Sequence, residues 1–237
     1  MKQYLKYFVQ AIPVFIGILL SFYIDNQIIS SGNTNYKNEL VKDLQTIIDS
    51  ETNQINNIRD LQYRCLKAAE DLIYDIRFND TSLSNKEISE KILLVSQRGT
   101  VSFFPQRGIY DELINTGSTK LIQSKNFRYA LSNTYNNLNS RNLAVSRIID
   151  DYFFREISNI NKKIIIISKE EKNDSGYVYS DLVPVFFKID MSYYKSDEFL
   201  SSVNQFKSLI ERYIDMLNKL ESSYELLKIY SEEELIN

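Results

Sequence analysis

The chain has no histidine, which removes most common catalytic and metal-binding arrangements from its 237 residues. A histidine general base, a Ser-His-Asp triad and a histidine-containing zinc site are all excluded. No P-loop, dinucleotide fingerprint, HExxH motif or EF-hand loop occurs either. We therefore predict that the protein is not an enzyme and has no catalytic residue, metal site or cofactor, although carboxylate-based catalysis stays formally open.

Cysteine, glycine and proline are also scarce. Cys65 is the single cysteine, so the chain cannot form an internal disulfide, and its place in an apolar stripe is typical of a small core residue. Six glycines and three prolines are too few for a turn-rich β-sandwich and favour long helices. The formal net charge of −3 predicts no binding of duplex DNA.

One segment near the N-terminus, QAIPVFIGILLSFYIDNQ at residues 10–27, is almost wholly apolar. A helix over about residues 7–29 is long enough to cross a hydrocarbon core of about 30 Å. Flanking lysines and tyrosines resemble interfacial anchors, and no small-residue cleavage site follows the apolar run. Residues 1–31 are therefore predicted to be a membrane anchor with one transmembrane helix; a cleaved signal peptide and a buried soluble helix are the alternatives.

The polar residues of this segment share one edge of the predicted helix, which we call the polar edge. At 100° per residue, this edge holds Gln3, Gln10, Gly17, Ser21 and Asp25. Small and polar residues are typical of contacts between membrane helices, and polar groups within a span face a partner or water. The polar edge is the predicted pore or oligomer seam; a lone anchor with polar residues near the interfaces is the alternative.

Residues 32–237 have the pattern of a helical soluble domain. A long stalk helix is expected over 33–78 after a break at Gly32, because apolar residues recur in steps of three and four with a gap at Glu51. A basic helical lobe is expected over 79–135, with helices over 84–96, 106–116 and 118–135, and a helical hairpin with an acidic tail over 138–237, with helices over 138–168 and from Ser196 onward. Residues 183–187 suit a short strand or a short helix. The predicted fold class is all-α, an N-terminal transmembrane helix followed by an antiparallel helical bundle with long helices.

The basic lobe is a candidate anion-binding surface. Residues 86–128 hold seven basic and four acidic residues. The predicted ligand is a nucleotide or oligonucleotide signal, held by Arg98, Arg107, Lys120, Lys125 and Arg128. The helix expected to start at Ser118 would offer its first N–H groups to a phosphate.

The C-terminal region has the opposite charge. Residues 211–237 hold seven acidic and three basic residues. We predict that Glu232, Glu233 and Glu234 form an autoinhibitory tail that occupies the basic surface when no ligand is bound. Two solvated charged faces are the alternative.

Three stretches resemble an uncharacterised bacterial family of small single-pass membrane proteins with a helical soluble domain. They are GILLSFYIDN at 17–26, LVKDL at 40–44 and YDELINTGSTKLI at 110–122. The resemblance covers about residues 5–135, while Gln27 and Ile12-Pro13 depart from the family pattern. It implies a topology and a helical fold but no activity.

The architecture is also similar to that of membrane effectors in bacterial antiphage systems, some of which open a channel in response to a nucleotide. This similarity implies an oligomeric single-pass effector of the bacterial inner membrane that forms a ligand-gated ion pore. The alternative is a membrane-anchored interaction protein that presents a helical partner-binding bundle and has no channel activity. Lysines on both sides of the anchor leave its orientation open, and the lone cysteine favours a cytoplasmic over a periplasmic domain.

Overall fold

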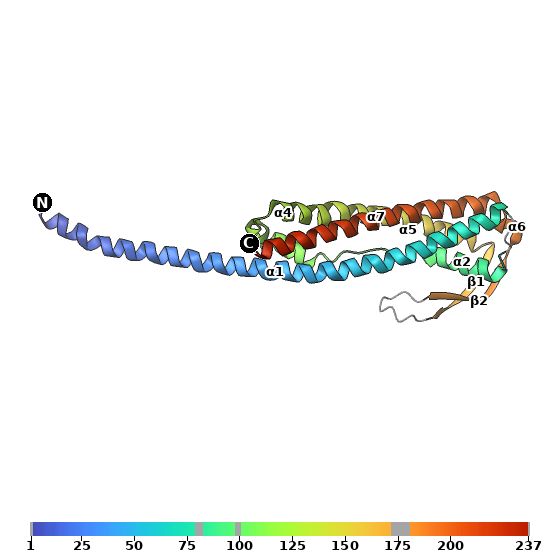
Figure 1. The fold of residues 1–237 in the computed structure, drawn as a ribbon, viewed down its shortest axis with the longest axis horizontal. Coiled ribbons are helices and arrows are strands. Elements are labelled where there is room, and N and C mark those ends of the chain that lie inside the picture. The colour runs from blue at the N-terminus through green and yellow to red at the C-terminus, as the bar shows by residue number, and fades with distance from the viewer. Residues whose placement is uncertain (1, 79–82, 98–100, 172–180, 237) are drawn as a thin grey trace.

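The computed structural model describes residues 2–78, 83–97, 101–171 and 181–236. Figure 1 shows an elongated helical body, with one helix projecting far beyond it at the N-terminal end. Helices make up 83% of the structure, which confirms a mostly helical bundle. The additional feature is a two-stranded hairpin near the far end of the body (Figure 1).

The elements follow in the order α1 (Lys2–Phe78), α2 (Asn85–Gln97), α3 (Gly108–Asn115), the 3₁₀-helix η2 (Ser118–Leu121), α4 (Lys125–Ser132), the π-helix η3 (Asn133–Leu138), α5 (Asn139–Ile160), β1 (Ile164–Glu171), β2 (Asp181–Ile189), α6 (Met191–Tyr194) and α7 (Asp197–Ile236). The consecutive helices α4, η3 and α5 form one rod. The chain direction of this rod and of α1 leads away from the end of the body where α1 projects. Helix α7 runs in the opposite direction beside them, so the C-terminus lies at the end where α1 projects (Figure 1).

The core lies where α1 and α7 pack along each other, the most extensive pairing between helices. Leu44 and Ile55 of α1 are fully buried, as are Leu217 and Tyr224 of α7. Burying one such side chain is worth about 1.5–3 kcal/mol, so the apolar stripes of the two helices provide much of the driving force for folding. Cys65 is also buried, as its place in the apolar stripe predicts, and its thiol donates to the Leu94 carbonyl at 3.0 Å.

Three helix ends lie close to the limits of the predicted helix ranges. Ser84 forms a capping box with Glu87, because its Oγ accepts from the Glu87 N–H at 3.3 Å and its own N–H donates to the Glu87 carboxylate at 2.8 Å. Ser196 caps α7 by accepting from the Phe199 N–H at 3.2 Å. Gly117 follows α3 with a φ of +74°, the left-handed conformation that favours glycine after a helix.

Three predicted helix boundaries are wrong. The stalk helix does not begin at residue 33, because α1 runs unbroken through Gly32; one glycine costs a helix only about 1 kcal/mol. The helix predicted over 118–135 does not start at Ser118, since Ile122 is extended and Ser124 caps α4 by accepting from the Phe127 N–H at 3.2 Å. The helix predicted over 138–168 ends at Ile160.

The β-hairpin corrects the all-α prediction locally. Its strands are antiparallel, with Ile164 opposite Ile189, Ile166 opposite Phe187, and a register shift after Ile167. Burial alternates along β1, as expected for a strand with one covered face. Isoleucine loses side-chain freedom in a helix and fits a pleated surface, which explains why residues 164–167 end the helix instead of extending it.

Among the residues that the structure describes, no helix is both long enough and apolar enough to cross a membrane. The transmembrane helix predicted over about 7–29 therefore has no support from the described residues. The side chains of residues 7–12 and 14, which belong to that predicted helix, lie outside them.

Candidate functional site

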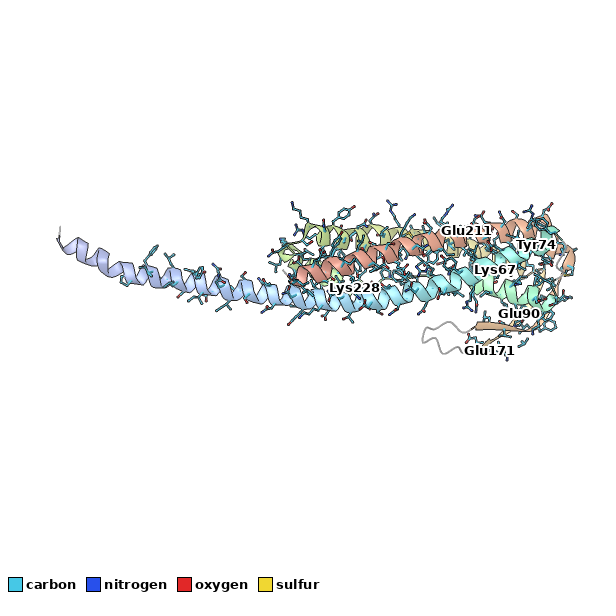
Figure 2. All side chains as sticks on the ribbon, in the orientation of Figure 1. Lys67, Tyr74, Glu90, Glu171, Glu211 and Lys228 are labelled. Carbon is cyan, nitrogen blue, oxygen red and sulfur yellow. The ribbon has the colours of Figure 1, made fainter. Side chains whose placement is uncertain are left out.

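The part of α1 that projects from the bundle has an unusual surface. Residues 15–36, which we call the stem, are exposed without exception. Its large apolar side chains up to residue 29 are between 49% and 65% exposed, and Tyr36 at its end is 39% exposed; the former are Phe15, Ile16, Ile18, Leu19, Leu20, Phe22, Tyr23, Ile24, Ile28 and Ile29. At 100° per residue they point to nearly every side of the helix, and Figure 2 shows the N-terminal part of the stem with no other element beside it. The other end of the stem meets the bundle, where the Tyr36 hydroxyl donates to Glu112 of α3 at 2.5 Å. A helix that is apolar around its circumference normally contacts lipid or protein.

Part of the predicted polar edge lies on the stem. Gly17, Ser21 and Asp25 line one shallow hollow together with two apolar neighbours. A Cβ built on Gly17 would meet no atom within 4 Å, so the hollow is open to an approaching helix. The side chains of Gln3 and Gln10 lie outside the described residues. The described polar edge is therefore an accessible strip of three residues.

Two of the predicted anion-binding residues, Arg107 and Arg128, form hydrogen bonds within the lobe. Arg107 donates to the Tyr135 carbonyl at 2.8 Å and pairs with Asp111 at 3.2 Å. Arg128 donates to the Ile122 carbonyl. Both guanidinium groups thus hold the backbone of the lobe in place.

The other basic residues have different positions. Lys120 and Lys125 are exposed, and Arg98 lies outside the described residues. Lys120 lines a cavity of about 390 Å³ between α1, η2 and the end of α7. The phosphate-binding helix start predicted at Ser118 is wrong, because only a four-residue 3₁₀ turn begins there.

At this cavity, Glu234 of α7 accepts hydrogen bonds from three donors. The Lys37 ammonium lies 2.8 Å from Oε1, the Gln123 N–H lies 3.0 Å from Oε1, and the Ser124 N–H lies 2.9 Å from Oε2. Burial alone would raise the pKa of Glu234, but the Lys37 ammonium and the two N–H groups outweigh it and lower the pKa below its ordinary value. The carboxylate is therefore buried in its charged form.

The predicted acidic tail therefore divides into two kinds of residue. Glu232 and Glu233 are exposed, whereas Glu234 is buried against residues of the basic lobe. Its cation is Lys37, which sequence reasoning missed. The signal was present, since Lys37 precedes Leu40 and Val41 by three and four residues and so falls on the buried face of α1.

A second buried carboxylate lies deeper in the body. Glu51 of α1 is fully buried, accepts from the Gln106 N–H and lies 3.4 Å from the Tyr135 hydroxyl. Burial raises the pKa of Glu51 to about 7, although hydrogen bonds from Gln106, Tyr224 and Tyr135 lower it in part. The gap in the apolar period at Glu51 is thus a buried polar site.

Tyr135 lies in the π-helix η3, a rare element that is frequent at functional sites. Its ring stacks on Tyr110 with centroids 4.6 Å apart and meets Tyr224 edge-on. Residues 101–105, which belong to no helix or strand, pass through the same region, where Phe103 donates its N–H to the Tyr213 hydroxyl at 2.8 Å. Glu51 therefore ties α1 to the lobe and to α7 through aromatic neighbours.

Comparison with protein-family models, curated proteins and solved structures finds no match for this chain.

Proposed function

We propose that the protein is an oligomeric single-pass membrane effector, in which the stem enters a lipid bilayer and associates with other copies along its polar edge. The observation that carries this proposal is the stem itself, an unbroken continuation of a bundle helix with exposed apolar side chains on nearly every side. Transfer of such side chains from water to lipid is favourable, at about 0.8 kcal/mol for each buried CH₂.

Control of the stem by the bundle is part of this proposal, and it is supported by α1, which the two share. Lys228 of α7, labelled in Figure 2, pairs with Asp49 of α1 at 2.6 Å, and Glu234 pairs with Lys37 farther toward the stem. A ligand that moves the end of α7 would change the restraint on α1 where it leaves the bundle. In this proposal the stems form a ligand-gated ion pore with a role in bacterial antiphage defence.

Vesicle flotation with the full-length protein tests the membrane step. The double variant Ile16→Lys/Leu20→Lys places two charges on the stem, and we expect its lipid-bound fraction to fall at least about tenfold. Leu226→Lys/Ile229→Lys is the matched control, because these residues are equally exposed on α7 of the bundle. Flotation of the stem variant at the wild-type level would refute membrane insertion.

Cross-linking and ion flux then test association and the pore. Gly17→Ile fills the open hollow of the polar edge, and we expect it to reduce cross-linked oligomers, whereas Leu19→Ile on the opposite side of the stem should not. Ligand-dependent ion flux through vesicles that contain the oligomer would support the pore.

The alternative function is a membrane-anchored interaction protein. It is favoured by the outward face of the hairpin, where Ile165 and Ile167 are exposed beside Phe186, the cross-strand partner of Ile167. Vesicle binding without ion flux under any ligand would support this alternative and exclude the pore.

A further inference from the structure

The boundary between stem and bundle is marked by a buried lysine. Residues 15–36 are exposed, and Lys37 is the first buried residue among those of α1 whose side chains the structure describes, with a side chain 5% exposed. Lysine is almost never buried without a partner, because its ammonium loses strong hydration. The buried Lys37 ammonium therefore requires an anion beside it, at the point where α1 enters the bundle.

Glu234, near the end of α7, provides this anion. Its side chain is 2% exposed, and besides Lys37 it accepts from the N–H groups of Gln123 and Ser124. These two N–H groups precede α4, whose helix dipole adds positive potential at the same point. Three donors from two elements thus converge on one carboxylate supplied by a third element.

The carboxylate does not fill the space around it. The cavity of about 390 Å³ beside it is also lined by Ser30, Thr34, Asn38 and Lys120. The Asn38 Oδ1 atom is buried without a hydrogen-bond partner among the described residues. A cavity of this size lies within the range of small-molecule sites, and Lys120 adds a second cation at its wall.

We infer that Glu234 occupies a preformed anion-binding site, formed by Lys37 and the N–H groups of Gln123 and Ser124, that a phosphate-bearing ligand can occupy in its place. Phosphate suits these donors because it offers more acceptor oxygens and more charge than a carboxylate, and lysine together with free N–H groups at a helix start is the usual phosphate-binding set. Lys120 would face the other phosphate oxygens or a second phosphate.

Exchange of the two anions would free the end of α7 from α1 and α4. Glu234 competes well because it is tethered, which gives it a high effective concentration. The binding site itself stands independently, while its effect on the stem rests on the proposed function. The class of ligand is thus a phosphomonoester or diphosphate, either soluble or part of a lipid headgroup.

Anion rescue in the full-length protein in detergent micelles tests the site. Glu234→Ala removes the internal anion and should lower Tm, and 20 mM inorganic phosphate or pyrophosphate at constant ionic strength should raise the Tm of this variant by about 4 °C or more beyond the wild-type response. Glu232→Ala, an exposed neighbour, is the matched control and should respond like wild type. Adding Lys37→Met to Glu234→Ala should abolish the rescue.

An equal phosphate response in Glu234→Ala and Glu232→Ala would overturn the inference, as would rescue that persists without Lys37. If Glu234→Ala does not fold, Glu234→Gln keeps the side-chain size without the charge. Pyrophosphate should then bind this variant at least about tenfold more tightly than wild type in calorimetry; equal affinity would overturn the site.

Vesicles distinguish the two sources of phosphate. Rescue of Glu234→Ala by phosphatidic acid vesicles, but not by phosphatidylcholine vesicles, supports the site with a lipid headgroup as ligand, whereas rescue by soluble pyrophosphate alone supports it with a soluble ligand. Pyrophosphate rescue in a protein that fails to float with vesicles would refute the membrane function and leave the anion site intact. Flotation with vesicles without any rescue by phosphate or pyrophosphate would refute the anion site and leave the membrane function intact.

Discussion

Glu51 and Glu234 are both buried carboxylates, but the groups around them differ. Glu234 lies against the Lys37 ammonium and two backbone N–H groups, and its pKa is lowered. Glu51 is held by the Gln106 N–H and tyrosine hydroxyls, and its pKa is raised to about 7. No described residue places a cation in contact with Glu51.

The comparison shows that burial alone does not decide the charge of a side chain. Burial penalises the ionised form of both carboxylates, and the donors around each one decide whether that penalty is overcome. A full positive charge at 2.8 Å overcomes it at Glu234, whereas neutral donors only reduce it at Glu51. Glu234 is therefore ionised at neutral pH, whereas Glu51 titrates near pH 7.

The largest expected effect comes from removing the cation at the Glu234 site. Lys37→Met leaves a buried carboxylate without its ammonium, and we expect a loss of about 3–5 kcal/mol in the free energy of unfolding at pH 7. Urea unfolding of the full-length protein measures it. Lys42→Met, on the exposed side of the same helix, should change stability by less than about 0.5 kcal/mol. A loss as small as that control would show that the backbone N–H groups suffice.

The next effect is a gain of stability from neutralising Glu51. Because its pKa is about 7 in the folded state and 4.5 in its ordinary state, the folded protein holds more protons between these values, so stability falls as pH rises through this range. Glu51→Gln should remove that fall and exceed wild type by up to about 3 kcal/mol at pH 8. Unfolding curves from pH 4 to 8 measure the difference, and parallel curves for the two proteins would contradict the raised pKa.

A third buried carboxylate extends the comparison. Asp75 accepts from the Lys195 ammonium at 2.7 Å and the Tyr194 hydroxyl at 2.9 Å. Burial alone would raise the pKa of Asp75, but its hydrogen-bond donors outweigh burial and lower the pKa. Since Lys195 is 32% exposed, Lys195→Met should cost only about 1–2 kcal/mol at pH 7. This cost should shrink as pH falls below about 4, because protonation of Asp75 removes the charge that Lys195 stabilises.

Lys67→Met is the control for this measurement. Lys67 is an exposed partner of Asp71 on the surface of α1, and its loss should cost less than about 0.5 kcal/mol. A cost equal to that of Lys195→Met would mean that burial of Asp75 does not strengthen its ion pair.

The smallest effect is expected at Tyr135. Its hydroxyl lies 3.4 Å from Glu51 and lowers the pKa of that carboxyl, so Tyr135→Phe should move the pKa of Glu51 further up at a cost below about 1 kcal/mol. The shift in the pKa of Glu51 is measured by comparing the stability of Tyr135→Phe with that of the double variant Tyr135→Phe/Glu51→Gln as a function of pH. The midpoint of the pH range over which their stability difference changes reports this pKa. Tyr129→Phe, which is 74% exposed, should leave the midpoint unchanged.

Much of the helical framework could be predicted because its signals are local. The apolar stripe of α1 from Leu40 onward, the capping box at Ser84 and the helix end at Gly117 each depend on residues within a few positions of one another. Strand β1 was missed although its signal was also local, whereas a strand over residues 183–187, within β2, was one of the two predicted alternatives. Residues 164–167 are four β-branched residues in a row, and such short apolar runs suit a helix end or a strand equally well by periodicity alone.

The candidate sites show the same division. The amino-acid sequence by itself determined that residues 15–24 of the stem are mostly apolar, that Gly17, Ser21 and Asp25 share one edge, and that the C-terminal region is acidic. Composition and helical period do not depend on distant contacts. Only the tertiary structure decided that Glu234 and not its neighbours is buried, and that Lys37, 197 residues away, is its partner. Packing of α7 against α1 and α4 brings these groups together, and a charge becomes strongly held only where packing excludes water from it.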